Sequence, residues 1–113
     1  MYLCISVLLF SCQQNPEAHL PKGILDTDKM TSVMVDIQLV EGLIAVRTIQ
    51  TEKINFYYNS TFKKHKIDKE TFDRSIEYYT DHPAELEIIY QDVITELSKK
   101  QASIQSKQDS TSN

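Results

Sequence analysis

The sequence has no tryptophan, and it holds only 2 glycines and 3 prolines in 113 residues. Folds built from strands depend on such residues for their many tight turns, so this shortage favours helices. No run of 18 apolar residues occurs, which argues against a permanent membrane-spanning helix. The net charge of −4 argues against nucleic-acid binding, which needs a cationic face. The remaining composition, 41% hydrophobic and 25% charged, is typical of one small globular domain.

The motifs of enzymes and cofactor sites are also missing. His19, His65 and His82 are scattered, and none stands four residues from another, as paired metal ligands on a helix do. The sequence contains no glycine-rich phosphate loop and no G-x-S-x-G turn. We therefore expect a protein that has no metal, no cofactor and no catalytic activity.

The N-terminus, MYLCISVLLFSC, is apolar and uncharged, and a polar segment follows it. The apolar run is too short to span a bilayer, but it has the length of the apolar region of an export signal. The letters LFSC at residues 9–12 resemble a bacterial lipobox. This resemblance implies that residues 1–11 are cleaved as a signal peptide and that Cys12 is acylated. The acyl chains would then anchor the protein in membrane lipid.

The residues after Cys12 carry sorting information. By resemblance to lipoprotein sorting signals, Gln13 is not the aspartate that retains a lipoprotein in the inner membrane, and no acidic run that marks surface export follows. The resemblance implies a periplasm-facing position on the outer membrane. Two alternatives remain open: a buried N-terminal element with two free thiols, and a disulfide between Cys4 and Cys12.

The mature chain is predicted to be all-α, a small bundle of three to four amphipathic helices. Residues 12–22 form a polar linker and residues 23–98 the helical domain. Residues 99–113 are predicted to be a disordered tail, because only Ala102 and Ile104 are apolar there.

Helical spacing of apolar side chains predicts the first two helices. The first begins near Asp26 or Thr27, both good N-caps, and extends to about residue 47. Its apolar stripe consists of Met30, Val33, Met34, Ile37, Val40 and Ile44. The second covers about 54–65. No strong helix breaker separates them, so a single helix over 26–65 remains an alternative.

The next two helices have clearer boundaries. Asp68 is predicted to cap the third, and that helix ends before Pro83, because a residue that precedes proline avoids the helical region. Pro83 suits the first turn of the fourth helix. Apolar residues recur at helical spacing in both (Phe72, Ile76, Tyr79; Leu86, Ile89, Tyr90, Val93, Ile94, Leu97).

Three motifs together resemble a known family. They are Met34-x-Asp36-Ile37-x-Leu39-x-Glu41-Gly42, Phe72-x-x-Ser75-x-x-Tyr78-Tyr79 and Pro83-x-x-Leu86-x-x-Ile89-Tyr90-x-x-Val93. Their order is similar to that in DUF4296, a family of Bacteroidetes lipoproteins, and the resemblance covers about residues 20–98. One departure is the turn at residues 64–67, where such sequences often carry a glycine. The family has no assigned activity, so the resemblance implies no site residues.

Glu41 falls within the apolar stripe of the first helix. A carboxylate in that position must be hydrogen-bonded, paired or protonated. It could be a structural acceptor, satisfied by a nearby tyrosine, Ser75 or Arg74. It could also be a ligand-binding group, with the tyrosine pairs Tyr57-Tyr58 and Tyr78-Tyr79 as stacking platforms for a peptide or a glycan.

Some apolar residues lie off the main stripes. Leu39, Leu43 and Ile88 are predicted to face another protein. The leading hypothesis is therefore a non-catalytic protein-interaction or structural module of the cell envelope. The alternative is a periplasmic module that binds a peptide or glycan. In the tail, Ser110 lies in the sequence Asp109-Ser110-Thr111, which resembles a Bacteroidetes O-glycosylation motif.

Overall fold

The computed structural model describes residues 20–47 and 49–112. The predicted signal peptide, Cys12 and most of the linker lie outside the described residues. Over the described ranges the chain forms helices and no strands, so the all-α prediction is confirmed. The helices are α1 (Thr27–Ala45), the short 3₁₀ helix η2 (Thr51–Lys53), α2 (Ile54–Lys64), α3 (Lys69–Thr80) and α4 (Pro83–Thr111).

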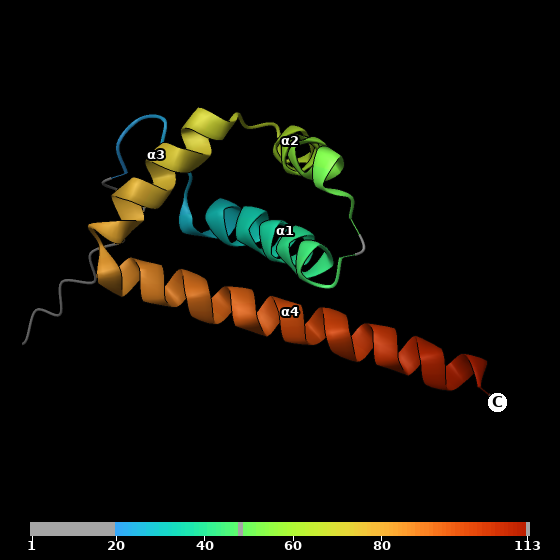
Figure 1. Cartoon of the computed structure of the whole chain (residues 1–113). Coiled ribbons are helices and arrows are strands. Elements are labelled where there is room, and N and C mark those ends of the chain that lie inside the picture. Colours follow the sequence, from blue (N-terminus) through green and yellow to red (C-terminus); the bar gives the residue numbers. More distant parts are fainter. Residues whose placement is uncertain (1–19, 48, 113) are drawn as a thin grey trace, which may run out of the picture.

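Helix α1 is the central element of the bundle (Figure 1). It lies between α2 and α4, while α3 crosses one end and connects α2 to α4. Seven of its 19 residues are buried, more than in any other helix (Met30, Thr31, Val33, Met34, Val35, Ile37 and Val40). Because α1 has neighbours on two sides, its buried face is wider than a single apolar stripe.

Local capping fixes where α1 begins and ends. The carboxylate of Asp26 accepts a hydrogen bond from the Lys29 N–H at 2.7 Å, as predicted for an N-cap. At the other end, Arg47 has a φ of 56° and its N–H bonds to the Ile44 carbonyl. This left-handed residue terminates the helix, so α1 and α2 are two helices and not one.

The turn between α2 and α3 is the place where a glycine is common in similar sequences and where this chain has none. Lys66 has a φ of 56°, which is a conformation that favours glycine. Its N–H bonds to the Lys63 carbonyl, and the Ile67 N–H bonds to the Phe62 carbonyl. These two bonds make a Schellman motif, and Ile67 packs against the cluster that contains Phe62, a contact that often accompanies this motif. The turn therefore keeps the glycine geometry although a lysine occupies the position.

The core has two parts, and each contains side chains from a different face of α1. The α1–α4 cluster joins α1 to α3 and α4, and it consists of Met30, Met34, Val35, Tyr79, Ile89 and Val93. The α1–α2 cluster is smaller and consists of Val33, Ile37 and Phe62. In the first cluster Met30, Tyr79 and Ile89 are fully buried.

Two polar side chains of α3 fix the segment that enters α1. The Leu25 N–H donates to the Ser75 hydroxyl oxygen at 2.9 Å, and the Tyr79 hydroxyl donates to the Leu25 carbonyl at 2.7 Å. Ser75 and Tyr79 are both fully buried and lie one helical turn apart. The Ser-x-x-Tyr-Tyr motif thus satisfies buried backbone groups and has a structural role.

Helix α4 differs from its prediction. It starts at Pro83 as expected, but it continues to Thr111, so the predicted disordered tail over 99–113 is wrong for the described residues. All residues from Ser98 to Ser112 are exposed, and Figure 1 shows this part extending past α1. The segment contains several lysines and glutamines, which have good helix propensity, and it has no glycine or proline. The polar composition of this segment therefore predicted its exposure correctly, but the predicted disorder was wrong.

Ser110 accordingly lies on a helix. Its hydroxyl donates to the Ser106 carbonyl at 2.9 Å, and its side chain is exposed. Within the described ranges, no helix is both long and apolar enough to cross a membrane.

Candidate functional site

A hollow of about 480 Å³ opens between α1, α2 and the first turns of α3. This volume lies within the range of small-molecule binding pockets in proteins. Its lining combines an apolar floor (Ile37, Phe62 and Phe72) with a polar rim (Glu41, Asn55, Tyr58, Asn59, Lys69 and Asp73). We call this the Glu41 hollow.

Helical spacing brings these side chains together. Ile37 and Glu41 stand four residues apart on α1, so both project from one face. On α2 the same spacing aligns Asn55 with Asn59, and Tyr58 aligns with Phe62. The centroids of the Phe62 and Phe72 rings lie 5.4 Å apart, which joins α2 to α3 at the floor. The Schellman turn at Lys66 sets the angle between these two helices.

Glu41 and Tyr58 interact across the hollow. The pKa of the Tyr58 hydroxyl lies above its ordinary value, first because partial burial disfavours the phenolate. The negative charge of Glu41 raises this pKa further, as does a hydrogen bond between the hydroxyl and that carboxylate. The Tyr58 hydroxyl therefore experiences a negative potential from the rim.

The rest of the rim is polar and partly uncommitted. Lys69 and Asp73, one turn apart on α3, form an ion pair. The side-chain amides of Asn55 and Asn59 make no hydrogen bond to another described residue. Glu41 and Asp73 contribute two negative charges against the single positive charge of Lys69, so the hollow is negative overall.

The prediction that Glu41 lies within the buried stripe is wrong, because its side chain is exposed. Position 41 borders the stripe at the rim of the hollow, and its partner is Tyr58 instead of a residue of α3 or α4. Tyr78 and Tyr79 do not line the hollow. Tyr79 is fully buried and cannot form a stacking platform. Tyr78 is half-buried and stacks on His82, with ring centroids 4.0 Å apart.

Leu39 and Leu43 are 43% and 41% exposed, as expected for residues off the main stripe. They line a shallower hollow of about 270 Å³ together with Tyr57 and Ser60 of α2. Residues 39 and 43 project about 200° away from residues 37 and 41 of the same helix. This Leu39 groove is therefore on the opposite flank of the α1–α2 contact. Ile88 is 52% exposed, but it belongs to α4 and does not line the groove.

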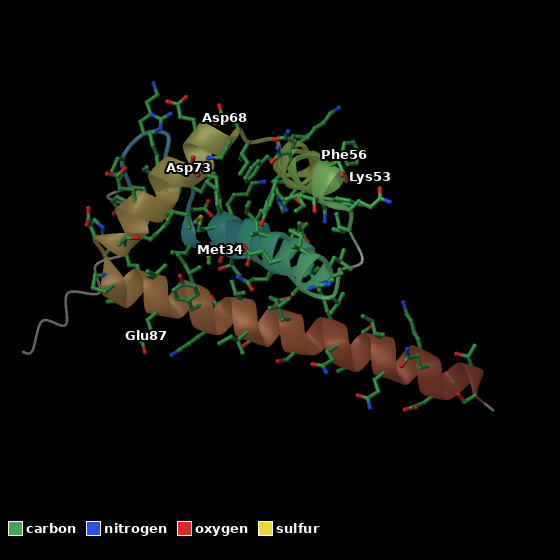
Figure 2. The ribbon with its side chains drawn as sticks, in the orientation of Figure 1. Met34, Lys53, Phe56, Asp68, Asp73 and Glu87 are labelled. Atoms are coloured by element: carbon green, nitrogen blue, oxygen red, sulfur yellow. The ribbon has the colours of Figure 1, made fainter. Side chains whose placement is uncertain are left out.

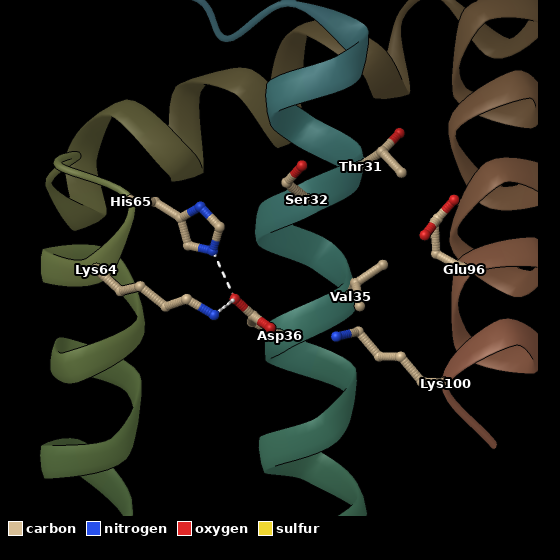
Figure 3. A pocket seen from close by; sticks show the side chains of 8 residues that line it. All are labelled: Thr31, Ser32, Val35, Asp36, Lys64, His65, Glu96 and Lys100. Atoms are coloured by element: carbon tan, nitrogen blue, oxygen red, sulfur yellow. Dashed lines mark hydrogen bonds and ion pairs between the residues drawn. The ribbon is translucent and has the colours of Figure 1, made fainter. Parts of the chain in front are cut away.

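A second polar cluster joins α1 to the end of α2 (Figure 3). Asp36 is 2.8 Å from the Lys64 ammonium and 2.7 Å from Nε2 of His65. Burial acts to raise the pKa of Asp36, but hydrogen bonds and charge from Lys64 and His65 outweigh it, so this pKa lies below its ordinary value. The cluster borders a hollow of about 270 Å³, into which Glu96 and Lys100 reach from α4. The Asp36 carboxylate is already paired with Lys64 and His65, as is typical of an ion pair with a structural role.

Sequence reasoning missed Asn55 and Asn59, whereas Tyr58 belongs to one of the two tyrosine pairs that it considered as a stacking platform. The available signal was the spacing of two amides four residues apart that flank a tyrosine on one helix. Over the described ranges, no three His, Cys, Asp or Glu side chains lie close enough to hold a metal ion.

Comparison with known proteins gives a family but no function. The family described as a domain of unknown function, DUF4296, matches residues 21–103. Neither a curated protein nor a solved structure matches the chain.

Proposed function

Since the chain belongs to the DUF4296 family, whose function is unknown, we propose a function from the site itself. The protein is a non-catalytic binding module that holds a short peptide segment in the Glu41 hollow. The observation that carries this proposal is a concave site in which Glu41 and a tyrosine converge over an apolar floor. Ligand sites commonly combine an apolar surface with a few convergent polar groups.

A peptide fits this lining better than a glycan does. A sugar ring stacks its C–H face on an open aromatic surface, and the Phe62 ring at the floor is too buried to offer one. A peptide side chain can instead place its apolar part on the floor and its polar end at the rim. The amides of Asn55 and Asn59 can pair with the backbone of such a segment, because each carries both a donor and an acceptor.

Two substitutions on neighbouring residues of α2 test this proposal. Asn59 lines the Glu41 hollow and Ser60 lines the Leu39 groove, and both are exposed. Asn59→Trp should fill the hollow and abolish binding to a peptide array, whereas Ser60→Trp should leave that binding intact. Binding to a glycan array alone, or loss of peptide binding only in Ser60→Trp, would contradict the proposal.

A second candidate function is docking of another protein on the Leu39 groove. Several large apolar side chains are exposed at this end of the bundle, including Val46 at 69% and Phe56 at 66%. Figure 2 shows Phe56 next to Lys53 at the start of α2, on the outside of the bundle. Exposed apolar residues in such numbers favour an interaction surface. The Ser60→Trp variant serves this candidate as well, because it should disrupt such a complex.

The proposed module is anchored by acyl chains on Cys12 and faces the periplasm from the outer membrane. Support comes from the apolar N-terminal run, the lipobox resemblance at residues 9–12 and the absence of aspartate at position 13. Cys12→Ser should abolish incorporation of a clickable fatty acid. Cys4→Ser is the matched control and should label normally, because Cys4 would leave with the signal peptide. Equal labelling of both variants would contradict the anchor.

A further inference from the structure

The charge of the Glu41 hollow narrows the chemical class of ligand that it can bind. Its rim carries one net negative charge, and Glu41 is the carboxylate that is not tied to a basic residue of the rim. The Lys69–Asp73 pair neutralises itself, so the field inside the hollow comes mainly from Glu41. A neutral or anionic ligand gains nothing from this field, whereas a cation is attracted by it.

The floor provides the second half of the recognition. Phe62 and Phe72 present a pair of tilted rings beside Ile37, and Phe62 and Ile37 are more than nine-tenths buried. Long cationic side chains have an apolar stem that packs on such surfaces while the charged end stays at the polar rim. The faces of aromatic rings attract cations as well, and arginine makes this contact more often than lysine.

We infer that the hollow binds the arginine side chain of a peptide, with the guanidinium at Glu41 and the methylene stem on the apolar floor. This inference rests on the proposed function and adds the chemical class of the ligand. A guanidinium carries five donors in a planar fork, so it can reach the Glu41 carboxylate and the carbonyl oxygens of Asn55 and Asn59 together. The Tyr58 hydroxyl shares the rim with Glu41 and can donate to that carboxylate and orient it.

The other hollows that carry charged side chains lack this combination of an unpaired carboxylate and an aromatic floor. The hollow of about 320 Å³ between α1 and α4 has three acidic residues, Asp28, Asp92 and Glu96, but no apolar side chain lines it. In the hollow beside Asp36 the carboxylate already accepts from Lys64 and His65, and the volume is about 270 Å³. A cation entering there would compete with two bound partners. The comparison therefore places the cation-binding chemistry at Glu41.

The test compares two peptides that differ only in charge. Acetyl-Gly-Arg-Gly-amide and the same peptide with citrulline have nearly the same shape, but citrulline is neutral. Each is titrated into the ¹⁵N-labelled full-length protein in a neutral detergent, and the backbone and side-chain amide signals of Asn55 and Asn59 are followed by NMR. The arginine peptide should give saturable shifts at these residues, and the citrulline peptide should bind at least about tenfold more weakly.

Variants of the protein distinguish a contact between the guanidinium and Glu41 from binding that does not depend on this carboxylate. Glu41→Gln should weaken binding of the arginine peptide by about tenfold or more, since it removes the charge and keeps the volume. Glu77→Gln is the matched control, because Glu77 is exposed on α3 outside the hollow, and it should leave affinity unchanged. Retained affinity in Glu41→Gln, or absence of shifts with the arginine peptide, would overturn the inference.

A further outcome distinguishes this inference from the proposed function. Equal binding of both peptides, abolished by Asn59→Trp, would leave the hollow as a peptide site and refute its preference for a cation. Binding of neither peptide, together with loss of array binding in Asn59→Trp, would likewise refute the preference alone. Array binding that survives Asn59→Trp would refute both.

Discussion

The two core clusters of this small bundle both include side chains of α1, but they differ in how completely they exclude solvent. In the α1–α4 cluster the buried side chains of Ser75 and Tyr79 are paired with backbone groups of Leu25, and among the described residues only the Thr31 hydroxyl is buried without a partner. The α1–α2 cluster is incomplete, and the Glu41 hollow opens at its edge. Its rim includes two amides without hydrogen-bond partners among the described residues.

This difference indicates that two faces of α1 have different roles. The face with Met30, Met34 and Val35 packs against α3 and α4 and contributes most to stability. The face with Val33 and Ile37 packs against α2, and the Glu41 hollow opens beside Ile37, where binding groups stay accessible at small cost. Functional surfaces often belong to the less stable parts of a fold.

The largest expected effect contrasts a tyrosine from each region. Tyr79→Ala should lower the free energy of unfolding by about 3–5 kcal/mol, because it leaves a cavity in the α1–α4 cluster. Tyr58→Ala should lower it by only about 1 kcal/mol, because Tyr58 is half-buried at the rim. Urea denaturation monitored by circular dichroism measures both. Equal losses of stability in the two variants would show that the two regions do not differ in how completely they exclude solvent.

The next contrast concerns polar groups. Ser75→Ala should cost about 1–3 kcal/mol, because the buried Leu25 N–H loses its acceptor. Asn59→Ala, on the exposed rim, should change stability by less than about 0.5 kcal/mol. Thermal melts of the two variants give this comparison. A large loss in Asn59→Ala would mean that the rim amides are structural and not available for a ligand.

A smaller effect of opposite sign is expected at the turn that orients α2 and α3. Lys66→Gly should stabilise the protein by about 1 kcal/mol, since it relieves the left-handed strain at a φ of 56°. Lys63→Gly is the control, and it should destabilise by about 1 kcal/mol because Lys63 is inside α2. Stabilisation by neither variant would contradict the strained Schellman turn.

The smallest expected effect is on pH dependence. The folded-state pKa of Asp36 lies below its ordinary value of 3.8, so Asp36 contributes stability that is present above that pH. The contribution is lost as the pH falls below 3.8 through the folded-state pKa. Asp36→Asn should therefore be less stable than wild type near neutrality and should approach it in acid. Acid titrations of stability that keep a constant difference between the two proteins would contradict this role.

The sequence predicted the fold well where local physics decides it. The caps at Asp26 and Asp68 and the start at Pro83 follow from hydrogen bonding and proline geometry within one turn. Periodicity predicted the buried residues Met30, Val33, Met34, Ile37 and Val40 of α1 correctly, whereas Ile44 is only half-buried. Thr31 and Val35 are buried as well, because α4 covers a second side. The end of α4 was missed, since a polar sequence can be an exposed helix or disordered.

The site was predicted less well, because it depends on how three helices meet. Periodicity selected Glu41 as unusual, but it could not place this residue at the rim or identify Tyr58 as its partner. The tyrosine pair at 78–79 was correctly divided into a buried and a half-buried ring. Its assignment to a ligand site was wrong because α3 turns Tyr79 toward Leu25.

The most direct test of the proposed site is to find which residues touch a bound peptide. Intermolecular nuclear Overhauser effects can be measured between the arginine side-chain protons of acetyl-Gly-Arg-Gly-amide and the full-length protein. The Glu41 hollow predicts contacts from the arginine methylene protons to the rings of Phe62 and Phe72. Contacts to Leu39, Leu43 and Tyr57 instead would place the peptide in the opposite groove and contradict the account.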